Sequence, residues 1–209
     1  MAERNLRNLK EQRREYRRAL SRDQILDAAE QVFADHGYHD ASLREIAELA
    51  EFSVGAVYGF FSGKDDIYRA IFLRRAEEFM PQMREVLESD AAPLRQLLDL
   101  AAWQVAFFRR YPHWSRLVLR GGAIASPLVT PADDAQIQEN FAVAQRAQAE
   151  LIRRGQQSGD LRQGSPALLA RMFSGLVSAF QAAELAADPM AHLPVEDLLA
   201  VIEAAFAAG

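Results

Sequence analysis

The 209-residue sequence contains no cysteine, which excludes disulfide bonds and thiolate metal sites and gives no reason to expect an oxidising compartment. Long hydrophobic runs are missing too. The longest uncharged stretches, near residues 121–132 and 172–183, fall short of the roughly 20 apolar residues that a membrane-spanning helix needs. The N-terminal residues lack the apolar run of a secretory signal. We therefore expect a soluble, cytoplasmic protein without a membrane segment.

Strand-like patterns and the motifs of common enzymes are also scarce. No alternation of β-branched residues of useful length occurs, whereas apolar residues recur at helical spacing in almost every segment. Half of the residues are apolar, which is enough for one large core or two smaller ones. The sequence contains no GxGxxG, no phosphate-binding loop and no G-x-S-x-G motif. This pattern predicts an all-α protein and offers no catalytic motif.

The net charge of −5 is unevenly distributed along the chain. Residues 1–22 carry eight arginines and lysines against three glutamates, a net of +5, so the remainder carries −10. Such a basic N-terminal arm, assigned to residues 1–20, attracts phosphate groups. Leu6, Leu9, Tyr16 and Leu20 have helical spacing. The arm is therefore either a helix that continues towards residue 21 or a frayed, solvated tail.

Capping signals predict four helices in the N-terminal third of the chain. Ser21 with Gln24, and Ser42 with Glu45, have the spacing of a capping box, and Gly37 suits a helix end. The expected helices cover about residues 22–36, 42–50, 53–60 and 64–87.

Prolines predict five further helices in the remainder of the chain. Pro93, Pro166 and Pro194 are each placed to open a helix, and Tyr111-Pro112 interrupts one. We expect helices over about residues 93–110, 114–124, 132–157, 166–186 and after Pro194. Residues 21–68 then form a small N-terminal module of three helices, and residues 69–209 form a larger helical bundle.

Residues 42–67 place two short helices around a tight turn, an arrangement that presents the second helix to a DNA groove. The run over residues 25–68, ILDAAEQVFADHGYHDASLREIAELAEFSVGAVYGFFSGKDDIY, resembles the DNA-binding domain of TetR (tetracycline-repressor-type) transcriptional regulators. The match covers part of the first third of the chain. The resemblance implies a helix-turn-helix DNA-binding domain over 21–68 and a ligand-binding and dimerisation domain over 69–209.

Several residues of this run suit contacts with DNA. A hydroxyl and amides at the helix start near Ser42 can meet a phosphate, and small residues after Ser53 let the next helix approach base edges. Tyr58 and Lys64 offer a phenol and an ammonium to phosphates. Each feature alone also has a purely structural explanation, so the prediction depends on the set. The candidate DNA-binding residues are Ser42, Arg44, Ser53, Val54, Gly55, Ala56, Tyr58 and Lys64.

Two features depart from the family pattern. Glu51 stands in the turn where the family usually has glycine, so it must adopt a left-handed conformation or bend the turn differently. Residues 23–64 hold only Arg44 and Lys64 against eight acids, a net of −6, unlike the basic surface expected of a DNA-binding domain. An alternative interpretation is therefore a protein-interaction module whose helix-turn-helix no longer binds DNA.

The middle of the larger domain contains several aromatic residues that together suit an apolar ligand cavity, although for any single one an ordinary helical core is the more common explanation. Nearby cationic residues suit either an anionic head group or a solvated helix face: Arg109, Arg110, His113, Arg116 and Arg120. The candidate ligand-binding residues are Trp103, Phe107, Trp114, Phe141 and Phe173.

The two C-terminal helices suit dimerisation. Residues 166–186 are apolar nearly all round, and Gly175, Ala179 and Ala183 permit a close helix crossing. In the TetR family this helix pair forms the dimer interface.

We expect a homodimeric regulator, most simply a repressor, that a small apolar or amphipathic ligand of unknown identity releases from a palindromic double-stranded operator. We expect no enzymatic activity, no cofactor and no metal, since His36 and His39 lie at a helix end where polar residues are common.

Overall fold

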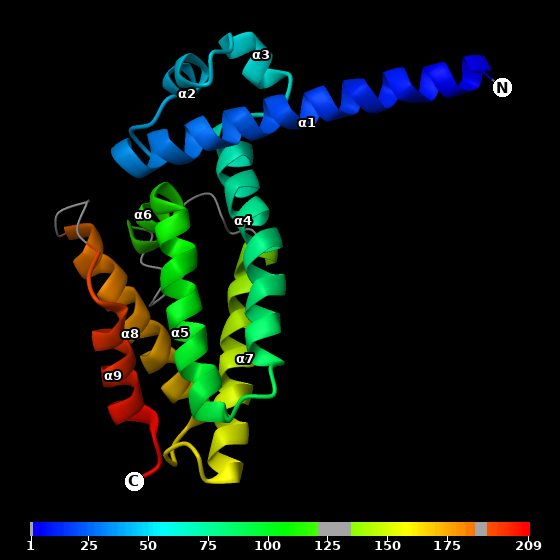
Figure 1. The fold of residues 1–209 in the computed structure, drawn as a ribbon. Coiled ribbons are helices and arrows are strands. Elements are labelled where there is room, and N and C mark those ends of the chain that lie inside the picture. Colours follow the sequence, from blue (N-terminus) through cyan, green and yellow to red (C-terminus); the bar gives the residue numbers. More distant parts are fainter. Residues whose placement is uncertain (1, 121–134, 187–191) are drawn as a thin grey trace. The chain divides into compact units, whose positions relative to one another are not determined.

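The computed structural model describes residues 2–120, 135–186 and 192–209, and α-helices dominate these ranges (Figure 1). They contain no strand, and an isolated β-bridge joins Leu161 to Ala207. The predicted all-α fold class is confirmed. Backbone contacts divide the chain into two compact units, Met1–Ile71 and Phe72–Gly209. Within the described ranges, no helix is long and apolar enough to cross a membrane.

The first unit contains α1 (Ala2–His36), α2 (Leu43–Leu49), α3 (Val54–Tyr58) and the start of α4 (Lys64–Leu87). Its core combines one face of α1 with apolar side chains from the three following helices and the turn before α4. The α1 face follows the predicted helical spacing. The buried core residues include Ile25, Leu26, Ala29, Phe33, Ile46, Val57, Phe61 and Ile67.

The start of α1 differs from the prediction. A capping box at Ser21 was expected to open this helix, but α1 begins at Ala2 and runs through Ser21 without interruption. The reason is that residues 2–20 contain no glycine or proline and many strong helix formers, so nothing ends the helix before Ser21. The basic arm is therefore a helical extension of α1 and not a separate segment.

The second unit contains the rest of α4, followed by α5 (Pro93–Arg110), α6 (Pro112–Arg120), α7 (Ala135–Ser158), α8 (Pro166–Ala186) and α9 (Val195–Phe206). Helix α5 contacts α6, α7, α8 and α9, so it lies at the centre of the bundle. Helix α6 begins at Pro112, two residues earlier than predicted, because proline suits the first helical turn. The predicted helical residues 121–124 and 132–134 lie outside the described ranges. The core includes Leu97, Leu100, Leu151, Ile152, Phe173, Ile202 and Phe206.

Candidate functional sites

The start of α2 is held by a complete capping box. The Ser42 N–H donates to Glu45 Oε2 at 2.8 Å, and the Glu45 N–H donates to Ser42 Oγ at 3.2 Å. The Ser42 hydroxyl also donates to Glu45 Oε2 at 2.7 Å. These hydrogen bonds from Ser42 hold the pKa of the Glu45 carboxyl below its usual value. The expected phosphate contact of Ser42 would therefore be made beside a carboxylate that remains ionised.

The turn between α2 and α3 contains Glu51 in the left-handed region, with φ of 60°. The Glu51 N–H donates to the Glu48 carbonyl at 3.2 Å, and the Phe52 N–H donates to the Ala47 carbonyl at 2.8 Å. These two bonds form a Schellman motif, the helix ending in which glycine is preferred at the left-handed position. Of the two geometries expected for Glu51, the structure therefore has the left-handed one.

Helix α3 presents an exposed apolar ridge. Ser53 Oγ accepts a hydrogen bond from the Ala56 N–H at 3.1 Å and thereby caps the helix. Val57 is buried, whereas Val54 and Tyr58, which lie four residues apart on one face of the helix, have 37% and 56% of their surface exposed. Gly55 adds no side chain to this exposed side. A valine, a glycine and a tyrosine thus form a surface without charged groups, which suits close approach to base edges and phosphates.

The Lys64 ammonium is less available for contacts with DNA phosphates than the sequence suggested. Its Nζ donates to the carbonyls of His39 and Ala41, both at 3.0 Å, and lies 4.6 Å from the centre of the Tyr38 ring. The ammonium therefore holds the α1–α2 connection, and two of its three N–H donors are already used. Arg44, the other cation predicted for this site, is exposed on α2.

The basic extension of α1 approaches the segment that follows α3. The Arg18 guanidinium lies 5.9 Å from the centre of the Phe60 ring, and the Arg22 guanidinium lies 5.1 Å from that of Phe61. These are cation–π distances. Since Phe60 and Phe61 are far from α1 in sequence, the spacing of charges alone could not reveal these contacts.

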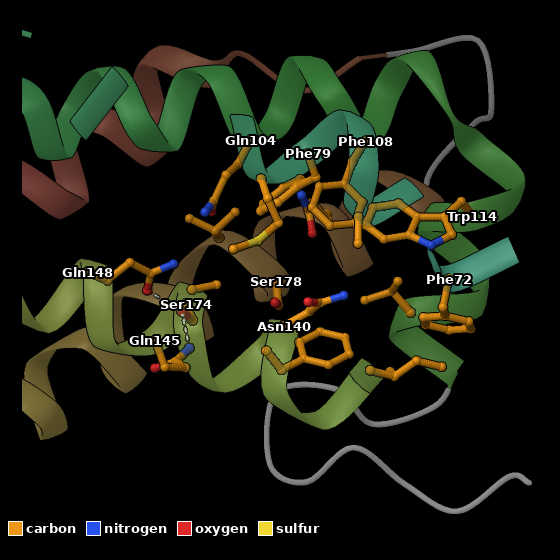
Figure 2. A pocket seen from close by; sticks show the side chains of 18 residues that line it. Phe72, Phe79, Gln104, Phe108, Trp114, Asn140, Gln145, Gln148, Ser174 and Ser178 are labelled. Carbon is orange, nitrogen blue, oxygen red and sulfur yellow. Dashed lines mark hydrogen bonds between the residues drawn. The ribbon is translucent and has the colours of Figure 1, made fainter. Parts of the chain in front are cut away.

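In the second unit a cavity of about 900 Å³, including its open mouth, lies among α4, α5, α6, α7 and α8. Figure 2 shows the amides of Gln104, Gln145 and Gln148 gathered at one end of the cavity and the rings of Phe72 and Trp114 at the other. The wall is otherwise mostly apolar. The polar lining residues are Gln104, Asn140, Gln145, Gln148, Ser174, Ser178 and Gln181.

Only some of the predicted ligand-binding residues line this cavity. Trp114 and Phe141 line the cavity, whereas Trp103, Phe107 and Phe173 do not. Phe173 is fully buried in the core and packs edge-to-face against Phe206. Phe107 is buried among other rings, and Trp103 Nε1 donates to Gln82 Oε1 at 3.3 Å. These three are core residues, because aromatic composition does not tell which face of a helix meets the cavity.

The polar part of the cavity wall was not predicted. Gln145 Nε2 donates to Ser174 Oγ at 2.9 Å, and Ser174 Oγ donates to Gln148 Oε1 at 2.8 Å, which links α7 to α8. In the described part of the chain, Gln181 Nε2 and Trp114 Nε1 are buried without a hydrogen-bond partner. The signal was present in the sequence, since Ser174, Ser178 and Gln181 follow helical spacing on an otherwise apolar helix.

Arg109, one of the cations beside the aromatic residues, is already paired. Its guanidinium donates to both carboxylate oxygens of Glu184, with Nε 3.1 Å from Oε1, and to the Leu193 carbonyl at 2.7 Å. The Leu193 N–H donates in turn to Glu184 Oε1 at 3.0 Å. Arg110 stacks on Tyr111 at 5.4 Å, and the side chain of Arg120 lies outside the described residues. The Arg109 guanidinium is therefore engaged with Glu184 and the Leu193 carbonyl.

The capped pair α2–α3, with the exposed ridge of α3, is a helix-turn-helix of the kind found in DNA-binding transcription regulators. Residues 25–71 match the model of the family described as bacterial regulatory proteins, tetR family. Over these residues the chain has the N-terminal domain of that family.

Several curated proteins are similar to this chain. The fatty acid metabolism regulator protein of Bacillus subtilis is 34% identical over 74 residues, which is 35% of this chain and 38% of that protein. The transcriptional activator FasR of Mycolicibacterium smegmatis is 35% identical over 111 residues, 52% of this chain and 49% of FasR. The chain thus spans half or less of these two relatives. The regulator UidR of Escherichia coli is 26% identical over 191 residues, 90% of this chain and 88% of UidR.

Solved structures share the fold over nearly the whole chain. FadR from Bacillus subtilis in complex with stearoyl-CoA is 22% identical, with a TM-score of 0.70 over 86% of this chain and 96% of FadR. AibR in complex with isovaleryl coenzyme A and operator DNA is 21% identical, with a TM-score of 0.74 over 89% of this chain and 98% of AibR. At these identities the likeness supports the all-helical fold with an N-terminal helix-turn-helix.

Proposed function

We propose that this chain is a homodimeric transcriptional regulator, most simply a repressor, that binds a palindromic operator through α3 and is released by a small apolar or amphipathic ligand. The observation that carries the proposal is the exposed α3 ridge of Val54, Gly55 and Tyr58 on a helix capped by Ser53. Ser42, Arg44 and Ala56 complete the proposed DNA surface, and Lys64 contributes chiefly by holding the α1–α2 connection. Residues 21–68 then act as the DNA-binding domain.

The dimer is supported by apolar side chains that the fold leaves exposed on its last two helices. Leu168 and Met172, four residues apart on α8, are 57% and 52% exposed, and Val201 on α9 is 51% exposed. A surface of this kind on two adjacent helices marks an association site. An isologous dimer through α8 and α9 would match the twofold symmetry of a palindromic operator.

The effector role is supported by the cavity. Its mixed wall, apolar with a cluster of amides at one end, suits a ligand that is mainly apolar and carries a polar group. Helix α4 contributes Phe72, Ala76 and Phe79 to this wall and begins at Lys64 shortly after α3 in the chain, so a change at the cavity can be transmitted along a continuous helix. The fatty acid regulator and the acyl-CoA complexes among the similar proteins make acyl compounds the first class to screen.

The test of DNA binding uses two substitutions of Tyr58. We expect Tyr58→Phe to weaken binding to a palindromic fragment from upstream of the gene by about tenfold, because a hydrogen bond to a charged phosphate is worth roughly 1.5–3 kcal/mol. Tyr58→Ala should weaken it further. Binding is measured by fluorescence anisotropy at several salt concentrations. Tyr111→Phe, which removes a tyrosine hydroxyl from the second unit, is the control and should leave affinity unchanged.

A second candidate is the interaction module without DNA binding, which the −6 charge of residues 23–64 favours. The same titration separates the two functions. If the wild-type chain shows no affinity for the palindromic fragment even in low salt, where phosphate attraction is strongest, the regulator function is wrong.

A further inference from the structure

Among the described residues, none that lines the cavity has an ionisable side chain. All 18 described residues that line it are apolar, aromatic, amide or hydroxyl residues. Two arginines on the helices that form the wall, Arg75 on α4 and Arg109 on α5, are engaged elsewhere. Arg109 is paired with Glu184, and Arg75 pairs with Glu78 at 3.3 Å and stacks 3.9 Å from the centre of the Tyr111 ring. A charged group placed in this cavity would lose its water and gain no opposite charge from these 18 residues.

Two hydrogen-bond donors at the wall have no protein acceptor within the described residues. Gln181 is 3% exposed and its Nε2 is unpaired, and the same holds for Nε1 of Trp114, which is 7% exposed. The other polar groups differ, since Gln145, Gln148 and Ser174 already bond one another. A buried donor without an acceptor is unfavourable, so a ligand oxygen that accepts from Gln181 or Trp114 gains binding energy.

We infer that the cavity takes an uncharged, mainly apolar molecule, or the uncharged part of a larger one, that offers a hydrogen-bond acceptor such as an ester, thioester or ketone carbonyl. The carbonyl accepts from the Gln181 amide, whose nitrogen is buried at the wall without a protein acceptor. The acyl or aromatic part lies against the rings of Phe72, Phe108 and Trp114. This inference rests on the proposed effector role of the cavity and narrows its ligand class.

The first experiment compares ligands that differ only in charge. Methyl decanoate with decanoate, and methyl naphthoate with naphthoate, are titrated into the purified full chain at neutral pH and followed by calorimetry. We expect at least one ester to bind roughly a hundredfold more tightly than its carboxylate, because burying an unpaired charge costs several kcal/mol. Decanoyl-CoA, as a further arm, shows whether the neutral acyl part can enter while a charged carrier stays outside.

The second experiment tests the donor. Gln181→Met removes the amide at nearly constant size and should weaken the bound ester about three- to tenfold, the value of one hydrogen bond, while methylnaphthalene binds as before. Gln163→Met is the matched control, because Gln163 is an exposed glutamine of the same unit that does not line the cavity, and it should leave the ratio of ester to hydrocarbon affinity unchanged. Circular dichroism and thermal unfolding show that both variants are folded.

The outcomes separate this inference from the proposed function. A carboxylate that binds as tightly as its ester, uncharged probes that all fail to bind, or a Gln181→Met chain with wild-type ester affinity would each overturn the inference. Calorimetry is done without DNA, and operator binding is measured on its own. Loss of ester selectivity with operator binding intact therefore contradicts the ligand class alone, whereas ester binding without operator binding contradicts the regulator function alone.

Discussion

Glu51 has a left-handed backbone conformation that favours glycine over a residue with a side chain. It lies at the left-handed position of the Schellman motif, where a side chain costs roughly 1–2 kcal/mol that glycine does not. We expect Glu51→Gly to stabilise the chain by about 0.5–1 kcal/mol, less than this cost because glycine is also freer in the unfolded chain. The measurement is the urea midpoint followed by circular dichroism.

Glu48→Gly is the control for this substitution. Glu48 is also exposed but lies inside α2 in a helical conformation, so the same change should destabilise the chain by about 1 kcal/mol. Equal shifts for the two variants would show that the conformation of Glu51 does not limit stability.

At the scale of single residues, the sequence predicted local features better than cavity features. The Ser42–Glu45 capping box and the Ser53 cap occur as expected, because capping depends on residues three positions apart. Trp103 and Phe173 belong to the core, whereas Gln181 lines the cavity. Which side chain meets the cavity depends on how distant helices pack, and composition does not contain that information.

At the scale of elements, the basic arm is a helical extension of α1 and can therefore hold its arginines in fixed positions. Arg13, Arg14 and Arg17 are exposed on a helical extension, and Arg18 packs on Phe60 just after α3. We expect the combined change of Arg13, Arg14 and Arg17 to Gln to weaken operator binding. The slope of log affinity against log salt should also become shallower, by about 0.9 for each phosphate that the arm no longer neutralises. Glutamine keeps the helix, which circular dichroism checks.

The matching control for the arm is Glu11→Gln with Glu15→Gln, which removes two acids from the same extension. For this variant, the slope of log affinity against log salt should not become shallower. If the arginine variant kept the wild-type slope, the arm would not contact DNA, and deletion of residues 2–18 should then also leave affinity unchanged.

At the scale of the whole molecule, the proposed dimer depends on the exposed face of α8. We expect Met172→Glu to convert this dimer to a monomer in analytical ultracentrifugation, because the substitution would place two carboxylates near each other across the proposed twofold axis. Leu49→Glu changes a 46% exposed leucine of α2 and should leave the mass unchanged. A Met172→Glu chain that remained dimeric would exclude α8 from the interface.

The helical architecture could be read from the sequence because prolines, glycines and capping residues mark the helix ends. Pro93 and Pro166 each open a helix as predicted. The start of α1 could not be read, since residues 2–20 permit a helix that no local signal requires. Contacts between distant segments, such as Gln145 with Ser174, follow from packing and became visible only in the folded chain.

The cavity also has a consequence for the lifetime of the protein. Unpaired amide and indole N–H groups at its wall lower stability, and a bound ligand raises it by RT ln(1 + [L]/Kd), about 2.7 kcal/mol at a hundred times Kd. Cellular proteases degrade the unfolded fraction of a protein, so a ligand-bound chain persists longer than a free one. The proposed effector would then also set how many copies of the protein survive.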